Sequence, residues 1–322
     1  MSTNSKKSLW MLTLSMAIFG SIGIFRRFIP LSSSGLAFFR GILGALFLLA
    51  VAKIQKKRVI HRIGMKNTLR LVITGAAMGV NWLLLFEAYN YTTVATATLC
   101  YYMQPTIVIL LSPMIFKEAI TAKKWVCVVL SVIGMVFVSG FMESGIPPLS
   151  EAKGILFGLG AAVLYAVVVI MNKKLPGLDA YEKTVIQLLS AAAVLVPYLL
   201  ISGQSFQVEW TPTVIVMLLI VGFVHTGVAY ALYFGCMDGV KAQTVAIFSY
   251  LDPIVALLLS AVILNERMTV FGIAGAVLII GAAMISETSI KREDAALRRD
   301  DPAKHRICGG DASEERKTGG AE

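Results

Sequence analysis

Long apolar segments, separated by short polar connections, follow one another along most of the chain. Each holds about 20 mostly apolar residues, the length that an α-helix needs to cross the hydrocarbon core of a bilayer. The segments are continuously apolar rather than alternating, which favours helices over the strands of a membrane barrel. The ten predicted helices cover approximately residues 9–25, 35–54, 69–88, 94–116, 125–141, 154–171, 184–201, 212–234, 244–264 and 270–285.

The fourth and ninth segments repeat one another. Residues 96–121 and 244–269 lie 148 positions apart and share many identities, and the same offset relates Gly79 to Gly227. A long-period repeat within an apolar chain indicates a duplicated membrane bundle. The identical pairs are Thr96/Thr244, Tyr102/Tyr250, Pro105/Pro253, Leu110/Leu258, Leu111/Leu259, Ser112/Ser260, Ile115/Ile263, Glu118/Glu266 and Thr121/Thr269.

Five helices per repeat is an odd number, so the second half must enter the membrane from the side opposite to the first. The two halves are then inverted-topology repeats related by a pseudo-two-fold axis in the membrane plane, with the substrate path between them. The expected fold class is an all-α polytopic membrane protein with ten transmembrane helices in two inverted five-helix repeats. The expected regions are a cytoplasmic N-terminus (1–8), a first repeat (9–141), an extracytoplasmic linker (142–153), a second repeat (154–286) and a cytoplasmic tail (287–322).

The tail, residues 287–322, differs in composition from the rest of the chain. It is polar and rich in charged residues, glycine and alanine. A segment of this kind cannot bury an apolar core, so we expect it to be disordered. A short amphipathic helix on the membrane surface is the alternative.

Composition supports the membrane assignment. The chain is 57% hydrophobic and only 15% charged, whereas soluble domains carry about 25% charged residues. Its polar side chains are too few to cover its apolar surface. The net charge of +10 does not indicate nucleic-acid binding, because the basic residues lie in short loops between apolar segments, as the positive-inside rule requires.

The distribution of basic residues predicts the orientation. If the N-terminus is cytoplasmic, most of the 29 Lys and Arg residues fall on the cytoplasmic side. Both termini are therefore expected in the cytoplasm, and the protein is expected to be a multi-pass protein of the plasma membrane. The basic residues on the outer side would be Arg26, Arg27, Lys153 and Arg267.

Signatures of catalysis and metal binding are missing from the sequence. The cysteines form no CxxC pair, the histidines form no HExxH motif, and no GxSxG, P-loop or dinucleotide-binding motif occurs. We therefore predict no enzyme, no metal site and no cofactor, and an intramembrane enzyme is the least favoured class. The residues concerned are Cys100, Cys127, Cys236 and Cys308, and His61, His225 and His305.

Polar residues in the middle of predicted spans are candidates for function, because an Asp or Arg there costs about 2.5–3.5 kcal/mol on insertion scales. Asp252 precedes Pro253 in the ninth helix, and its repeat counterpart Gln104 precedes Pro105 in the fourth. Each proline frees a carbonyl one turn back. Asp252 and Gln104 are expected to line a central cavity and recognise a polar or cationic group, with proton exchange at Asp252. The alternative is a purely structural kink.

Further candidates combine aromatic rings with polar groups. Tyr102 and Tyr250 share a helix face with the prolines, and a tyrosine suits a cavity for amphiphilic solutes; ordinary packing is the alternative. Arg40 in the second helix has three alternatives: extending outward to the membrane surface, pairing with Asp252, or binding a substrate carboxylate. The remaining candidates are Asn81, Trp82, His225 and Tyr230.

Two glutamates, Glu118 and Glu266, fall at the ends of the fourth and ninth helices, on opposite sides of the membrane. Thr121 and Thr269 follow them at the start of the next helix. We expect each carboxylate to cap the N-terminus of that incoming helix. A gating or proton role is the alternative.

These features together resemble a known family. Ten helices in two repeats, each closing with Tyr-x-x-Pro, then Leu-Leu, then Glu-x-x-Thr before the last helix, are similar to the EamA family of the drug/metabolite transporter (DMT) superfamily. Arg40, within Phe-Phe-Arg-Gly-Ile-Leu-Gly, is similar to the arginine that these proteins often carry in the second helix. The resemblance covers about residues 8–287.

The resemblance implies a secondary transporter that moves a small organic metabolite or amphiphilic solute, commonly outward and often coupled to protons. It also implies a central cavity lined by helices one to four and six to nine, with the fifth and tenth peripheral. Because Gln104 is not acidic like Asp252, a proton site made of paired carboxylates is not expected.

The expected partners are a small-molecule substrate, protons and the lipid bilayer, with no nucleic acid. Small residues that permit close helix packing leave a homodimer open. Two alternatives to export are also open. One is an uptake permease for a metabolite or cofactor, and the other is a membrane sensor or scaffold that acts through its charged tail.

Overall fold

The computed structural model describes residues 3–55, 64–116, 120–173, 180–202, 209–236 and 248–300. Within these ranges the chain is helical and contains no strand. The helices are α1 (Thr3–Arg27), α2 (Ser33–Ile54), α3 (Met65–Tyr91), α4 (Val94–Tyr101), α5 (Gln104–Phe116), α6 (Ala122–Val138), α7 (Phe141–Ser144), α8 (Leu149–Lys173), α9 (Ala180–Ser202), α10 (Pro212–Leu219), the π-helix η1 (Ile220–Val228), α11 (Ala229–Cys236), α13 (Leu251–Ile263) and α14 (Val270–Asp300).

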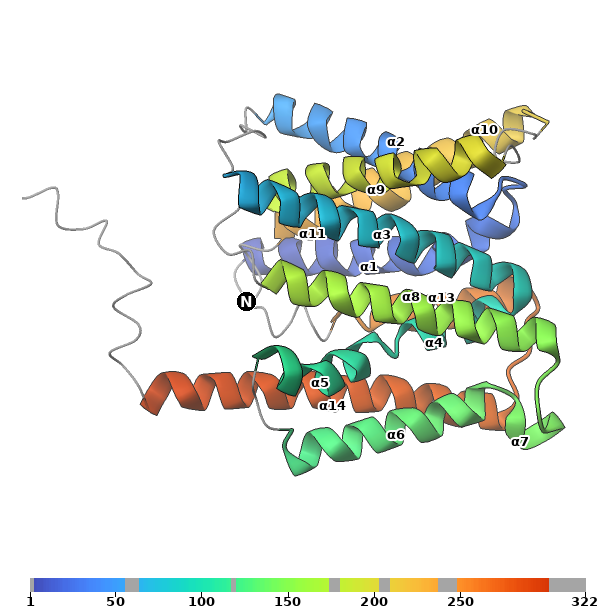
Figure 1. Ribbon diagram of the computed structural model, residues 1–322, viewed down its shortest axis with the longest axis vertical. Helices are drawn as coiled ribbons and strands as arrows, with labels where there is room; N and C mark the ends of the chain where they lie inside the picture. Colours follow the sequence, from blue (N-terminus) through green and yellow to red (C-terminus); the bar gives the residue numbers. More distant parts are fainter. Residues whose placement is uncertain are drawn as a thin grey trace, which may run out of the picture.

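The predicted all-helical membrane fold is confirmed. Seven candidate spans among the described helices are long and apolar enough to cross a membrane, and α13 and the first part of α14 add shorter apolar helices. The fourth predicted span consists of α4 and α5, and the eighth consists of α10, η1 and α11. The helices lie alongside one another as a bundle (Figure 1).

Helix contacts follow the repeat. The first-repeat helices α1, α2, α3, α4–α5 and α6 correspond in order to α8, α9, α10–η1–α11, α13 and α14. The contact of α3 with α9 corresponds to that of η1 with α2, and the contact of α3 with α8 corresponds to that of α11 with α1. Likewise, α1 packs against α13 as α8 packs against α4. This exchange of equivalent partners is what a pseudo-two-fold axis between the halves produces.

The helices α6 and α14 lie at one edge of the bundle, at the bottom of Figure 1, and pack against each other. Glycines face each other across this contact: a Cβ atom on Gly134 would lie 2.8 Å from the Gly275 carbonyl oxygen, and one on Gly275 would lie 2.5 Å from that of Gly134. In a bilayer the hydrophobic effect does not drive helices together, so their association depends on close packing. Small residues permit that packing because they let the helix backbones approach each other. The fifth and tenth spans are thus peripheral.

Close approach also joins the two halves at equivalent places. A Cβ atom on Gly79 of α3 would lie 2.5 Å from the Ala191 carbonyl oxygen in α9, and one on Gly227 of η1 would lie 2.5 Å from the Phe47 Cγ atom in α2. Gly79 and Gly227 are the pair related by the 148-residue offset. The repeat therefore preserves a glycine at both of these equivalent crossings between its halves.

Both predicted proline positions interrupt a helix. The chain leaves α4 at Tyr101 and enters α5 at Gln104, immediately before Pro105. The Met103 amide donates to the Cys100 carbonyl at 3.1 Å, and the Asp252 amide donates to the Ser249 carbonyl at 3.3 Å. These three-residue turns are tighter than an α-helix. Each break places polar backbone groups within the bundle.

Glu266 caps a helix, but not the one predicted. The incoming helix α14 is capped by Thr269, whose Oγ1 atom accepts from the Gly272 amide at 3.0 Å. The Glu266 carboxylate instead accepts from the Val94 amide, at the start of α4, at 2.9 Å. The physical reason is the turn at Asn265, whose φ of 53° reverses the chain before Glu266. Its counterpart Glu118 lies outside the described residues.

The helix α14 extends to Asp300, into the segment for which the composition predicts disorder. Residues 287–300 are rich in Ala, Leu, Arg, Lys and Glu, which have high helix propensity. Helical structure there needs no apolar core, because a preceding helix is already in place to propagate from. Residues 301–322 lie outside the described part of the chain.

Candidate functional site

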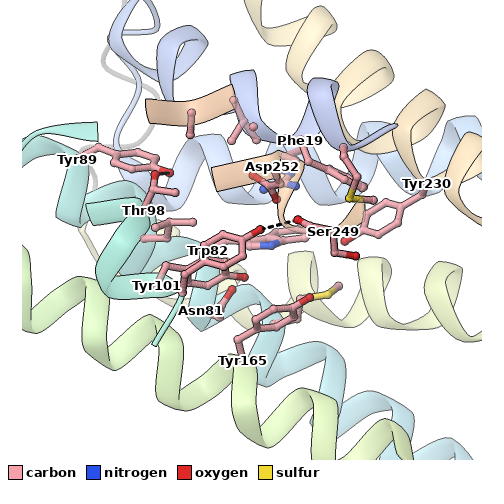
Figure 2. A pocket seen from close by; sticks show the side chains of 18 of the residues that line it. Phe19, Asn81, Trp82, Tyr89, Thr98, Tyr101, Tyr165, Tyr230, Ser249 and Asp252 are labelled. Carbon is pink, nitrogen blue, oxygen red and sulfur yellow. Dashed lines mark hydrogen bonds between the residues drawn. The ribbon is translucent and has the colours of Figure 1, made fainter. Parts of the chain in front are cut away.

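A cavity of about 200 Å³ lies between the two repeats (Figure 2). Its lining comes from α1, α2, α3 and α4 of the first half, and from α8, α11, α13 and the residues just before α13 in the second. Most lining side chains are aromatic or apolar, and a few are charged or polar. They are Met16, Phe19, Gly20, Ile22, Arg40, Met78, Asn81, Trp82, Leu85, Tyr89, Thr98, Tyr101, Tyr102, Tyr165, Tyr230, Tyr233, Ser249, Asp252 and Ala256.

Aromatic pairs form walls that connect the halves. Tyr101 of α4 stacks on Tyr165 of α8, with ring centroids 5.2 Å apart and an interplanar angle of 13°. Phe19 of α1 meets Tyr230 of α11 edge to face, with centroids also 5.2 Å apart. Such rings offer flat apolar faces, and the tyrosines add hydroxyl groups. These walls suit a solute that is partly apolar and partly polar.

Arg40 provides a positive charge at the cavity. Its side chain is 6% exposed, so it does not extend outward to the membrane surface. Its Nε atom donates to Thr226 Oγ1 at 2.9 Å, and its guanidinium carbon lies 4.2 Å from the centre of the Trp82 ring. A cation over an aromatic face is attracted by the ring quadrupole. Trp82 and Thr226 together hold the charge in place.

Asp252 provides a carboxyl group at the start of α13. The Tyr102 hydroxyl, which interacts with this carboxyl group, also donates to the Ser249 carbonyl oxygen at 3.5 Å (dashed in Figure 2). Within the described residues, no ion pair within 4 Å joins Asp252 to Arg40. Pairing with Asp252 was one of the three alternatives for Arg40, and the structure does not form this pair. The cavity instead holds a basic and an acidic side chain that form no direct pair.

Asn81 of α3 adds an acceptor at the cavity wall. Its Nδ2 atom donates to the Ala161 carbonyl oxygen of α8 at 2.5 Å, which assigns the nitrogen to that side of the amide. The side chain is 1% exposed, and among the described residues its Oδ1 atom has no hydrogen-bond partner. A buried acceptor without a partner costs free energy. A solute with an N–H or O–H group could relieve that cost.

The structure separates the predicted site residues into two groups. Gln104 and Tyr250 are not among the lining residues, although their repeat counterparts are. His225 lies in η1, 2.9 Å from Ser21 Oγ through its Nε2 atom, and packs on Phe25. Of these two repeated pairs, only Asp252 and Tyr102 thus line the cavity. The predicted residues that do line it are Arg40, Asn81, Trp82, Tyr102, Tyr230 and Asp252.

Several lining residues were not predicted. Most of the polar ones are tyrosines within an apolar segment or at its end, where a hydroxyl group needs a partner or a cavity. That signal is present in the sequence but does not tell which tyrosines share one face. Residues of this kind are Tyr89, Tyr101, Tyr165 and Tyr233, and the other polar ones are Thr98 and Ser249.

Comparison with known families gives two matches along the chain. The model of the EamA-like transporter family matches residues 6–140 and again residues 152–288. The boundary between the two matches falls between α6 and the body of α8, where the fold passes from its first five spans to its second five. The family model therefore detects the same duplication as the 148-residue repeat.

Individual relatives match over much of the chain. "Uncharacterized transporter YxxF" of Bacillus subtilis (strain 168) is 26% identical over 287 residues, which cover 88% of this chain and 90% of the relative. "Protein PecM" of Dickeya dadantii (strain 3937) is 27% identical over 225 residues, covering 67% and 72%. A solved crystal structure of a protein superposes with a TM-score of 0.61 at 16% identity, covering 89% of this chain and 98% of that one. That likeness shows the fold alone.

Proposed function

The chain belongs to the EamA-like transporter family, and we propose that it exports a small amphiphilic metabolite across the plasma membrane by alternating access. The observation that carries the proposal is the cavity between the repeats. Its lining comes from both halves and combines stacked aromatic rings with Arg40 and Asp252. When the two halves move against each other, a site that both of them line becomes accessible from one side of the membrane and then from the other.

In this proposal the solute lies between the aromatic walls. Asp252 accepts a hydrogen bond from a polar or cationic group, and the Arg40 charge faces any acceptor that the solute carries. Exchange of the solute for a proton at Asp252 would couple export to the proton gradient. The two termini are cytoplasmic, as the basic loops favour. This places the end of the bundle that carries Arg27 and Glu266 on the outside, and it is called the outer end below.

A comparison of metabolites in the medium and the cytoplasm tests the proposal. Cells that produce the protein should enrich at least one amphiphilic solute in the medium, relative to cells that lack the protein. Depletion of the solute from the medium with accumulation inside would favour the uptake permease. Equal metabolite profiles in the two strains would contradict transport.

Removal of the tail separates a transporter from a scaffold. A chain that ends before residue 287 retains the cavity and every helix that lines it, so export should continue within about twofold of the full chain. The measurement is the initial rate of export per protein molecule in the membrane. Loss of activity with normal protein levels would favour a protein that acts through its tail.

Trp82→Leu should lower the initial rate of transport by about threefold to tenfold. The indole ring holds Arg40 at 4.2 Å, and desolvated cation–π contacts contribute about 1–2 kcal/mol. The assay is flux in proteoliposomes with the metabolite found above. Trp210→Leu is the matched control, since Trp210 is 44% exposed and packs on Phe39 away from the lining. Equal effects of the two substitutions would contradict the role of Trp82.

A further inference from the structure

An ion pair joins the two repeats at the outer end of the bundle. The Arg27 Nη2 atom at the end of α1 lies 3.1 Å from Glu266 Oε1 and donates to the Thr92 carbonyl oxygen, also at 3.1 Å. The other Glu266 oxygen, Oε2, accepts from the Val94 amide at 2.9 Å and from the Ser260 hydroxyl. One carboxylate thus links α1 and α4 of the first half to the α13–α14 connection of the second.

This cluster lies directly beyond the cavity. Along α1, Gly20 lines the cavity, Gly23 lies about one turn farther out, and Arg27 about one turn beyond that. At Gly23, α1 packs closely on Val94, which is fully buried. The cavity residue Tyr89 lies just beneath, with its Cζ atom 3.5 Å from where a Gly23 Cβ would be. From the cavity outward, the first group is therefore Tyr89, the second is the apolar contact of Gly23 with Val94, and the third is the ion pair of Arg27 with Glu266.

The partners of the pair belong to different repeats. Glu266 is held by the second half, because its amide donates to the Ser260 carbonyl at 3.2 Å and the strained turn at Asn265 precedes it. Arg27 extends from a helix of the first half. Because α1 itself packs on α11 and α13 of the second half, the distance between the two side chains changes when α1 moves against the α13–α14 connection. Arg27 is 36% exposed and Glu266 14% exposed, so water can replace the contact when it breaks.

We propose that Arg27 and Glu266 are the outer gate of the cavity, closed in this structure, and that the pair separates when the cavity opens to the outside. The inference rests on the proposed alternating-access transport and adds the contact that regulates access to its site. The geometry also assigns Gly23 and Val94 as the apolar seal beneath the ion pair.

The test measures access to the cavity and needs no identified solute. A single cysteine replaces the cavity residue Ala256, and alanine replaces the native cysteines. Right-side-out membrane vesicles are treated with a membrane-impermeant cationic methanethiosulfonate reagent, and the rate of thiol labelling is followed. Arg27→Gln and Glu266→Gln should each raise that rate by about fivefold, as expected for a partly exposed ion pair.

Arg27→Lys, which retains the positive charge and the ability to donate to Glu266, should leave the labelling rate close to that of the parent protein. Gly23→Ala should raise the rate without altering any charge, because the added methyl group displaces Val94. The control is Lys153→Gln, which removes an exposed basic residue at the same end and should leave the rate unchanged. Size-exclusion chromatography of each variant verifies that it is folded.

Unchanged labelling in folded Arg27→Gln and Glu266→Gln would overturn the gate. Export is measured on the same set of proteins, so that the two proposals fail separately. Normal export by the parent protein together with unchanged labelling in the variants overturns the gate alone. Absence of export by the unmodified protein overturns the proposed function instead.

Discussion

Asp252→Asn should reduce flux of the transported metabolite by about tenfold or more in proteoliposomes. The substitution retains the size of the side chain but removes the ionisable carboxyl group from the cavity. A hydrogen bond to a charged group contributes about 1.5–3 kcal/mol, and each 1.4 kcal/mol corresponds to about a factor of ten. The amide also cannot exchange a proton, so the dependence of flux on pH should become flatter than in the parent protein.

Gln104→Met is the matched control for Asp252→Asn. The two positions are equivalent in the repeat, each immediately before a proline, but only Asp252 lines the cavity. The control should change flux by less than about twofold, as substitutions away from a site usually do. If the Asp252→Asn protein shows the flux and pH profile of the parent, Asp252 has no part in transport.

Gly79→Ala should lower the free energy of unfolding by about 2 kcal/mol. The new methyl group would lie 2.5 Å from the Ala191 carbonyl oxygen and 2.9 Å from the Ala191 Cα atom. Backbone atoms cannot rotate away, so α3 and α9 must separate, and overpacking of this kind costs about 1–3 kcal/mol. Thermal unfolding in detergent, followed by tryptophan fluorescence, should show a lower midpoint.

The same substitution at Gly281 of α14 is the control for Gly79→Ala. There a Cβ atom would meet no atom within 4 Å. Alanine has a higher helix propensity than glycine, by about 1 kcal/mol, so Gly281→Ala should leave the midpoint unchanged or raise it. A midpoint that falls equally in both variants would show that glycine is not required for the α3–α9 crossing.

Local and periodic features of the sequence predicted the fold well. The apolar segments became helices because their length and composition suit a bilayer whatever surrounds them. The repeat was visible as the pairs around Pro105 and Pro253, and the structure preserves it in the equivalent contacts of α3 with α9 and of η1 with α2. The helix breaks before both prolines were also predictable, because a proline removes a backbone donor wherever it stands.

The candidate site was predictable only in part. Asp252 and Arg40 were found because a charge in the middle of an apolar segment needs an interior surface. Tyr165 was missed, although it stacks on Tyr101, because its position in the sequence does not reveal which helix it faces. The partner of Glu266 was predicted wrongly, because the turn at Asn265 directs the carboxylate to a helix that lies 172 positions away in the chain.

Segment length and the 148-residue repeat were sufficient to predict a ten-helix membrane protein of duplicated architecture, since each is a property of the linear chain, and the resemblance to the EamA family added the transport function. Tertiary structure was needed to show that Tyr102 and Asp252, rather than Tyr250 and Gln104, face the cavity. The physical reason is that the direction of a side chain depends on the rotation of its helix after a break and on the neighbours that the helix packs against. The contact between Arg27 and Glu266 arises in the same way, from segments that only the folded bundle brings together.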